Sequence, residues 1–306
     1  MKKFFYIGAG CLFPLLMVWG ANQFFVPSAA SQSHNTTSAK DDIDKTVCVP
    51  MPEKISFCGE EAPLNEQDVR ERLDRELLIN TYWQSQTLLT LKEYNKIRPL
   101  IEPVLKKYNM PDDLIYLAAA ESAFRNVVSP SKAAGVWQFM EETAKIYGLE
   151  VNNEVDERYN FEKATEAACQ FLQAAHDTFG TWAMAACTYN MGMSNMKATI
   201  NAERTKSYFE LALNPESSRY VFRIMALKEV LSNPSKYGFV INQTDLYPPY
   251  KYKTVKVDSA IHSLADFAIA NGISYKELKL LNPWLRNTQL TNRLKKTYEI
   301  KILEKS

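Results

Sequence analysis

The sequence predicts a mainly helical protein that carries a small mixed module near its C-terminal end. Apolar residues recur at three- and four-residue steps through most of residues 65–233, which is typical of amphipathic helices. Between residues 250 and 303 two alternating, strand-like segments enclose two short helical patterns. The chain has 306 residues, enough for one or two domains with a sizeable core and accessory segments.

Composition excludes several classes of function. With 36 Lys and Arg against 35 Asp and Glu, the formal net charge is +1. The chain as a whole is not positive enough to attract a polyanion such as duplex DNA, and we expect no nucleic-acid partner. The five Cys include no CxxC pair and the three His are never four residues apart, so we expect no metal site or haem. A P-loop and a GxGxxG string are both absent, and we expect no cofactor.

Residues 1–26 are interpreted as a signal peptide or a membrane anchor. Lys2 and Lys3 precede an apolar run from Phe4 to Val18, and the segment as a whole is long enough to cross a bilayer by the rule of roughly 20 apolar residues. Cleavage, retention as an anchor and lipidation at Cys11 all stay open. In each case the rest of the chain is exported, and this segment contacts the membrane.

Residues 27–64 are predicted to be a flexible linker. From residue 27 to about 45 the sequence is small and polar, without periodicity. Cys48 and Cys58 follow, separated by nine residues. In an oxidising compartment they are candidates for a disulfide, and a bridge and two free thiols are equally open.

Residues 65–245 are predicted to form one helical domain. Pro111 with the two acidic residues after it is typical of a helix start, and Gly180 is typical of a helix end. The expected helical segments are residues 67–94, 97–105, 114–122, 161–179, 182–189, 196–203 and 217–231.

Residues 246–306 are predicted to form a separate β-α-α-β module. Its strands are expected over residues 250–257 and 297–303, and its helices over 261–270 and 275–281.

Glu121 is the strongest candidate for a catalytic group. It follows a continuous apolar run, residues 114–120, so burial should raise its pKa and leave it protonated near neutral pH. A carboxyl group in that state serves as a general acid. The alternative is that Glu121 emerges into water at the helix end and caps a neighbouring segment.

A second candidate segment lies between residues 133 and 140. Gly135 permits close approach of the backbone to a ligand, Gln138 offers hydrogen bonds, and Trp137 or Phe139 offers a ring that stacks on a sugar. The alternative is a turn that leads into a helix with two core aromatics.

Tyr189 and Asn190 are a third candidate, because they place polar groups at the end of a buried helix. A helix end capped by Gly192 explains them almost as well.

Taken together, these segments resemble the soluble lytic transglycosylase and goose-type lysozyme superfamily, in its membrane-bound lytic murein transglycosylase D branch. The resemblance covers about residues 94–237, and the C-terminal module resembles a LysM domain through residues 272–274 and 278–283. The motifs that carry it are Glu121-Ser122-Ala123-Phe124, residues 129–140, Thr143-Ala144, 147–149, 156–158, 179–182, Tyr189-Asn190-x-Gly192, and 215–221.

The resemblance implies a lysozyme-like helical fold and peptidoglycan as substrate. It implies cleavage of the β-1,4 bond between N-acetylmuramic acid and N-acetylglucosamine, with 1,6-anhydromuramyl ends. Glu121 is then acid and later base, without a second buried carboxylate beside it. By the same resemblance Ser122, Gln138, Tyr189 and Asn190 position the glycan, and Tyr189 hydrogen-bonds Glu121.

The resemblance further implies that the LysM-like module binds glycan chains and that the protein acts in the bacterial cell envelope, in the periplasm. Two alternatives stay open, a lysozyme-type hydrolase and an inactive peptidoglycan-binding scaffold. The oligomeric state stays open as well.

Overall fold

The computed structural model describes residues 47–293 and 295–304. The predicted signal or anchor segment, Cys11 and the linker up to residue 46 lie outside the described residues. Within the described part of the chain, no helix combines the length and apolar character needed to cross a bilayer.

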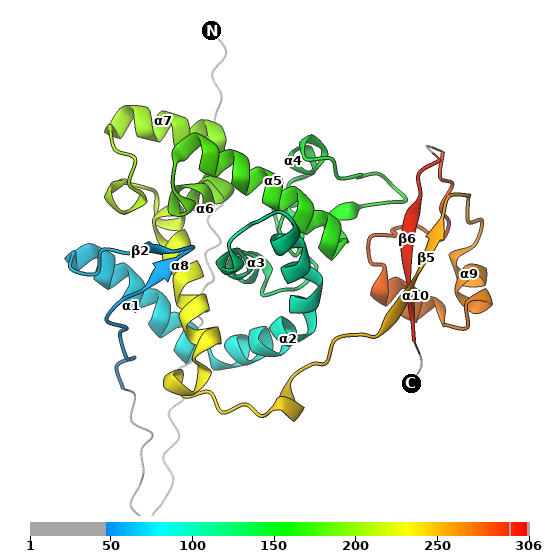
Figure 1. Cartoon of the computed structure of the whole chain (residues 1–306), viewed down its shortest axis with the longest axis horizontal. Helices are drawn as coiled ribbons and strands as arrows, with labels where there is room; N and C mark the ends of the chain where they lie inside the picture. Colours follow the sequence, from blue (N-terminus) through cyan, green and yellow to red (C-terminus); the bar gives the residue numbers. More distant parts are fainter. Residues whose placement is uncertain (1–46, 294, 305–306) are drawn as a thin grey trace, which may run out of the picture. The chain divides into compact units, whose positions relative to one another are not determined.

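Helices dominate the architecture, as predicted (Figure 1). The helices are α1 (Gln67–Tyr82), α2 (Gln84–Lys107), α3 (Ile115–Ser122), α4 (Glu141–Ile146), α5 (Phe161–Phe179), α6 (Trp182–Met191), α7 (Met193–Glu203), α8 (Pro215–Ser232), α9 (Leu264–Ala270) and α10 (Tyr275–Leu281). Among the described residues, three two-stranded antiparallel sheets accompany them: β1 (Ser56–Phe57) with β2 (Glu60–Glu61), β3 (Val127–Val128) with β4 (Ala134–Gly135), and β5 (Tyr252–Val257) with β6 (Tyr298–Leu303).

The helix starts follow from the local sequence. Asn160, Thr181 and Asn214 each accept a backbone N–H of the first turn of α5, α6 and α8, and Pro215 opens α8, where its missing N–H costs nothing. Gly180 ends α5 at a φ of 88°, as expected from the sequence.

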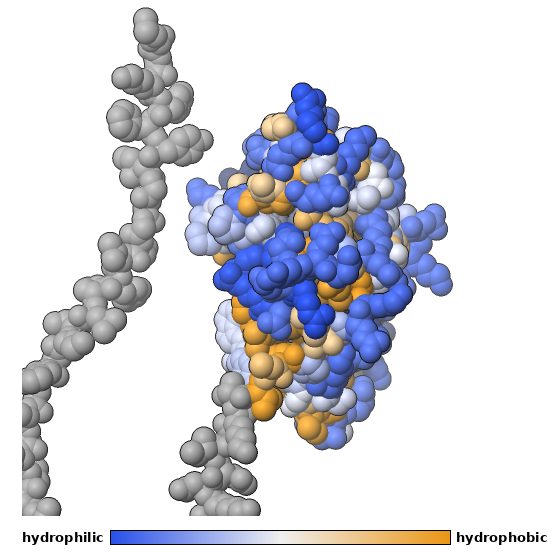
Figure 2. All heavy atoms as spheres, turned by 90° about the vertical axis from the view of Figure 1, so that its left-hand side faces the viewer, coloured by the Kyte–Doolittle hydropathy of each residue, from blue (hydrophilic) through white to orange (hydrophobic). Residues whose placement is uncertain are grey.

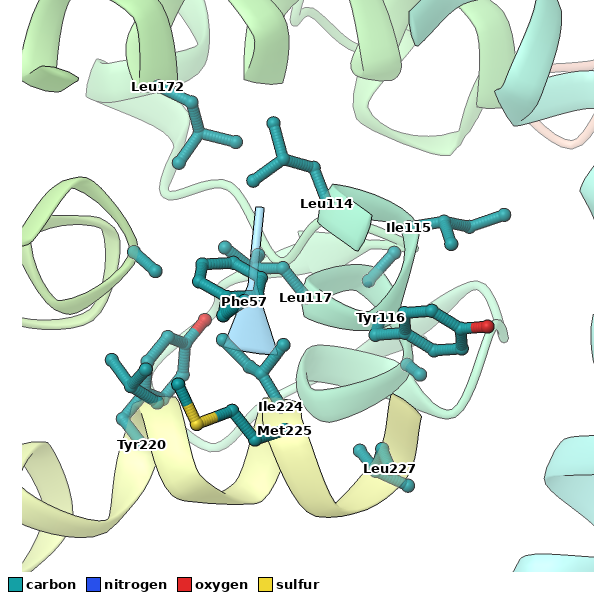
Figure 3. Close-up of a cluster of buried hydrophobic side chains, with 14 of the residues drawn as sticks. Phe57, Leu114, Ile115, Tyr116, Leu117, Leu172, Tyr220, Ile224, Met225 and Leu227 are labelled. Atoms are coloured by element: carbon teal, nitrogen blue, oxygen red, sulfur yellow. The ribbon is translucent and has the colours of Figure 1, made fainter. Parts of the chain in front are cut away.

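Helix α3 lies at the centre of the larger domain because nearly all of its residues are apolar or small. It packs against α8 and α2, and α8 packs in turn against α1 and α6. Figure 3 shows side chains of α3, such as Leu117, gathered against Ile224 and Met225 of α8. On the face shown in Figure 2, hydrophilic side chains predominate and hydrophobic ones show in smaller patches.

The stretch from Val47 to residue 64 differs from the flexible linker that we expected there. Phe57 is fully buried in the core of the helical domain. The carboxylate of Glu60 accepts the N–H groups of Trp182 and Ala183 at the start of α6, at 2.6 and 3.0 Å. A buried aromatic ring and a carboxylate on a helix N-terminus both fix the segment, so it is an integral part of the domain.

The described cysteines, Cys48, Cys58, Cys169 and Cys187, are all free thiols, so the bridge between Cys48 and Cys58 is not formed. Cys58 lies in the turn between β1 and β2, where its N–H donates to Asp113 Oδ2 at 2.7 Å. Cys48 is exposed.

The C-terminal module has the predicted β-α-α-β order, and β5 pairs with β6 over six residues. The module packs against residues 150–160 of the helical domain. The N–H of Asp156 donates to Trp284 O at 2.9 Å, and the N–H of Arg286 donates to Glu154 O at 2.7 Å. Ala134, Val155 and Tyr159 join the hydrophobic core of the module, so the two domains share buried surface.

Candidate functional site

Glu121 lies in the last turn of α3, at a pocket of about 390 Å³. Helix α3 ends immediately afterwards because Ala123 and Phe124 both adopt left-handed backbone conformations, with φ of 51° and 62°. Such conformations are uncommon for residues other than glycine and concentrate at functional sites. The turn places the Glu121 carboxyl group at the edge of the helical core, partly exposed to the pocket.

The environment of Glu121 matches the requirement for a general acid. Burial raises its pKa to about 7, while the hydrogen bond from Tyr220 and the charge of Arg223 act in the opposite direction. A carboxyl group with a pKa near 7 is present in both its acid and its base form at neutral pH, so it can give up a proton and take one back.

Tyr220, from α8, donates its hydroxyl hydrogen bond to Glu121 Oε1. Burial holds the pKa of Tyr220 well above its usual value, so the phenol remains protonated and remains a donor. The partner expected from the sequence was Tyr189, but the Tyr189 hydroxyl donates instead to Trp137 O at 2.7 Å. Tyr189 packs among aromatic rings, with Phe171 at 5.0 Å between centroids.

Replacing Tyr220 with Phe should raise the pKa of Glu121 above 7, because the variant removes a hydrogen bond that favours the charged form. A ¹³C NMR titration of the Glu121 carboxyl carbon measures this directly. Tyr189→Phe is the matched control and should leave the pKa near 7, since its hydroxyl bonds a backbone carbonyl. An unchanged or lower pKa in Tyr220→Phe would contradict this assignment of the donor.

A second carboxylate lines the same pocket, which the sequence did not lead us to expect. Glu76, on α1, is only 1% exposed. Its Oε1 lies 2.6 Å from Arg219 Nε, and its Oε2 lies 3.9 Å from Arg223 Nε. Arg223 also reaches Glu216 at 3.1 Å. Glu76 is therefore held in ion pairs with two arginines of α8 and ties α1 to that helix.

Ser122, which lines the pocket, and Gly135 are both buried structural residues. Ser122 Oγ is 2.8 Å from Val136 O and 3.1 Å from Ala118 O, so the hydroxyl joins the end of α3 to the segment after β4. Gly135 has a φ of 86°, and a Cβ atom there would lie 1.8 Å from Arg158 O. Close approach of backbone to backbone, rather than to a ligand, requires glycine here.

Gln138 is half-buried and its side chain is fixed. Its Nε2 donates to Gly135 O at 2.7 Å and to Val127 O at 3.0 Å, and Val127 lines the pocket of Glu121. Both amide hydrogens are used, so a ligand would meet the carbonyl oxygen of Gln138 as an acceptor.

The two aromatic rings next to Gln138 belong to the core. Trp137 is fully buried and donates from Nε1 to Thr165 Oγ1 at 2.8 Å, and Phe139 is 3% exposed. Neither presents a face to a sugar, which corrects the stacking role considered above and confirms the core alternative.

Asn190 lines a second hollow, beside Asn195, Asn214 and Glu216. Its Oδ1 accepts from Ser217 Oγ at 2.9 Å. Glu216 lines this second hollow, and its ion-pair partner Arg223 lines the pocket of Glu121. The ion pair therefore connects the wall of the hollow to the wall of the pocket.

Sequence reasoning missed the groups that α1 and α8 bring to Glu121. Arg219 and Arg223 are four residues apart and so share a face of α8, and that spacing was the available signal.

Within the described residues, no group of three or more His, Cys, Asp or Glu side chains is placed to hold a metal ion.

Comparisons with known proteins identify both domains. Residues 99–212 match the family model of the Transglycosylase SLT domain, and residues 253–306 match that of the Soluble lytic transglycosylase C-terminal LysM-like domain. The chain therefore contains an SLT transglycosylase domain and a LysM-like domain. Glu121, Ser122, Gly135, Gln138, Tyr189 and Asn190 all lie in the SLT match.

Over 278 residues the chain is 30% identical to "Membrane-bound lytic murein transglycosylase D" of Escherichia coli (strain K12), and equally to the protein of that name of Escherichia coli O6:H1. These alignments cover 86% of this chain and 59% of each relative, so the chain matches about three fifths of their length. A shorter stretch of 105 residues is 28% identical to "Putative tributyltin chloride resistance protein" of Alteromonas sp. (strain M-1), covering 34% of this chain and 51% of that protein.

Proposed function

We propose that the protein is a peptidoglycan lytic transglycosylase that cleaves the β-1,4 bond between N-acetylmuramic acid and N-acetylglucosamine and leaves 1,6-anhydromuramyl ends. One observation carries the proposal: Glu121 sits at a pocket, with its pKa raised to about 7 and a single phenol donor on its carboxyl group. The SLT match and the names of the E. coli relatives support it.

The reaction needs one carboxyl group that acts twice. Protonated Glu121 gives its proton to the glycosidic oxygen as the bond to the muramyl anomeric carbon breaks, and the N-acetylglucosamine part leaves with a free 4-hydroxyl group. The muramyl N-acetyl oxygen supports the positive anomeric carbon. The C6 hydroxyl oxygen of the same sugar then attacks that carbon, and the Glu121 carboxylate takes up its proton. No water is consumed.

The ion pairs of Glu76 favour this single-acid scheme. Most glycosidases that use water or a covalent intermediate have a second free carboxylate near the bond. Glu76 is the other carboxylate among the described residues of the pocket, and Arg219 and Arg223 engage it. A buried carboxylate paired in this way is a poor base or nucleophile, and Glu121 has to serve as both acid and base.

The site residues have distinct proposed roles. Glu121 is the catalytic residue and Gln138 contacts the glycan with its carbonyl oxygen. Ser122 and Gly135 fix the segment that carries Gln138, Tyr189 fixes the backbone of the neighbouring Trp137, and Asn190 lines the second hollow.

We also infer that the protein acts in the bacterial cell envelope, in the periplasm. The apolar segment at residues 4–18 supports export, either as a signal peptide or as a membrane anchor, and the E. coli relatives are named as membrane-bound. The LysM-like module would hold glycan strands next to the helical domain that cuts them.

Mass spectrometry of the muropeptides released from purified sacculi tests the proposed reaction. We expect products that end in 1,6-anhydromuramic acid, lighter by one water than those with a reducing end. Release of reducing-end products alone would identify a hydrolase instead. Binding to sacculi without any release would identify a scaffold.

A further inference from the structure

One wall of the Glu121 pocket lies outside the region that matches the SLT family. It comes from the end of α1 and the start of α2, and its residues include Glu76, Asn80, Trp83, Gln86 and Thr87. The SLT match begins only at residue 99. The match therefore assigns nothing to this wall, although it faces the same space as the proposed catalytic acid.

Trp83 is the unusual residue of the wall, because its side chain lines the pocket and is nevertheless 61% exposed. Full burial of a large apolar side chain is worth roughly 1.5–3 kcal/mol, and this indole leaves much of that unrealised. No aromatic contact of its ring is found among the described residues. An exposed indole at a pocket presents an apolar face that a ligand can cover.

The backbone of Trp83 is fixed although its ring is free. Its N–H donates to Ile79 O at 2.9 Å, and its carbonyl accepts the N–H of Thr87 at 3.1 Å. These bonds close the last turn of α1 and the first turn of α2, so two helices hold the residue in place. Because the backbone is already fixed, only the side-chain torsions of the indole have to be ordered when a ligand covers it.

The two arginines of α8 at the pocket are ion-paired, while Arg125, an exposed residue that also lines the pocket, adds a positive charge on another wall. Glu76 neutralises Arg219, and Glu216 pairs with Arg223. What remains on the α1–α2 wall is the indole and the polar side chain of Gln86, which is half-buried. An aromatic face next to a side-chain amide suits a pyranose ring, whose C–H groups cover the indole while its hydroxyl and N-acetyl groups hydrogen-bond.

We propose that Trp83 is the platform of a sugar subsite, on which an N-acetylhexosamine ring of the glycan strand stacks next to the bond that Glu121 cleaves. This inference rests on the proposed function for the identity of the strand. The volume of about 390 Å³ is within the usual range of ligand pockets, about 300–1,000 Å³.

Acrylamide quenching of tryptophan fluorescence tests the subsite without any turnover. The full-length Glu121→Gln protein is titrated with the β-1,4-linked tetramer of N-acetylglucosamine, and the same chain with Trp83→Phe is subtracted to isolate the Trp83 signal. We expect saturating tetramer to shield that signal from acrylamide. A Trp83 signal that stays equally accessible, or a tetramer that does not bind, overturns the proposal.

Calorimetric affinities supply the second measurement. Trp83→Ala in the Glu121→Gln background should weaken tetramer binding at the pocket about tenfold, equivalent to about 1.4 kcal/mol, while Trp83→Phe retains most of that affinity and binding to the LysM-like module is the same in every variant. Leu89→Ala is the matched control, since Leu89 is an exposed apolar residue of α2 that does not line the pocket. Equal affinities for Trp83→Ala and its parent overturn the subsite.

Product analysis of the unsubstituted protein separates failure of this inference from failure of the proposed function. A protein that shields Trp83 on binding but releases no anhydromuramyl products has the subsite without the reaction. A protein that releases these products with Trp83 still accessible has the reaction without the subsite.

Discussion

Glu121→Gln should lower the release of anhydromuramyl products about a thousandfold, since general acid–base catalysis contributes typically 10²–10⁴-fold and this residue acts in both steps. Gln has nearly the same shape and still accepts the hydrogen bond of Tyr220, so the pocket should keep its geometry. The measurement is the initial rate of muropeptide release from sacculi. Glu142→Gln, at an exposed position of α4, is the control and should cleave normally.

The raised pKa of Glu121 also lowers the stability of the folded protein at neutral pH, so Glu121→Gln should lose activity but gain stability. The native state raises the pKa from 4.5 to about 7, so it binds this proton more tightly than the unfolded state does. Stability therefore falls as the pH rises from about 4.5 to about 7 and stays lower above that range. Gln has no charge to bury, so above pH 7 the free energy of unfolding of the variant should exceed that of the original protein by roughly 1–3 kcal/mol.

Urea denaturation at pH 4.5 and pH 8 measures the difference. The variant and the original protein should be nearly equal at the lower pH and should diverge at the higher one. A variant that cleaves within tenfold of the original rate would remove Glu121 from the proposed mechanism, whatever its stability.

The helices and Glu121 were predictable because local sequence determines them. Seven apolar residues before Glu121 are enough to indicate burial, and Gly180 with Pro215 marks two helix boundaries. By contrast, one helical pattern was expected over residues 67–94, and the break at Trp83 has neither Pro nor Gly to announce it. Pro99 and Pro103 lie inside α2 without interrupting it.

The partners of Glu121 were not predictable because they depend on distant packing. Tyr220 is 99 residues away from it in the sequence, and Glu76 is 143 residues from Arg219. Glu76 belongs to a charged stretch that resembles a solvated helix face, and only the contact of α1 with α8 buries it. Periodicity states which face of a helix is apolar but not which other helix covers a polar residue.

Gly135→Ala should be the most destabilising single-methyl change considered for this chain, because two separate costs meet there. The left-handed conformation, with φ of 86°, costs an L-residue about 1–2 kcal/mol, and a Cβ atom would lie 1.8 Å from Arg158 O. Such an overlap forces a backbone shift, which in packed regions typically costs a further 1–3 kcal/mol. We expect a total loss of about 2–5 kcal/mol in urea denaturation.

Arg158 has little freedom to retreat from the added methyl group. Its guanidinium pairs with Asp156 through two hydrogen bonds, at 2.9 and 2.7 Å, and donates to the carbonyls of Lys132 and Phe139. The segment that carries Gly135 must therefore move instead. Because Gln138 bonds Gly135 O, the glycan-contacting amide moves with it, and cleavage should fall together with stability.

Gly148→Ala separates the two costs, because Gly148 has nearly the same φ, 83°, but nothing within 4 Å of the added Cβ atom. It should lose only about 1–2 kcal/mol and keep its activity. Equal losses in the two variants would mean that backbone conformation alone makes glycine necessary at residue 135. A larger loss in Gly135→Ala would show that the contact with Arg158 O positions this segment. Ala134, the residue before Gly135, belongs to the hydrophobic core of the LysM-like module, so the same segment would then connect the site to that module.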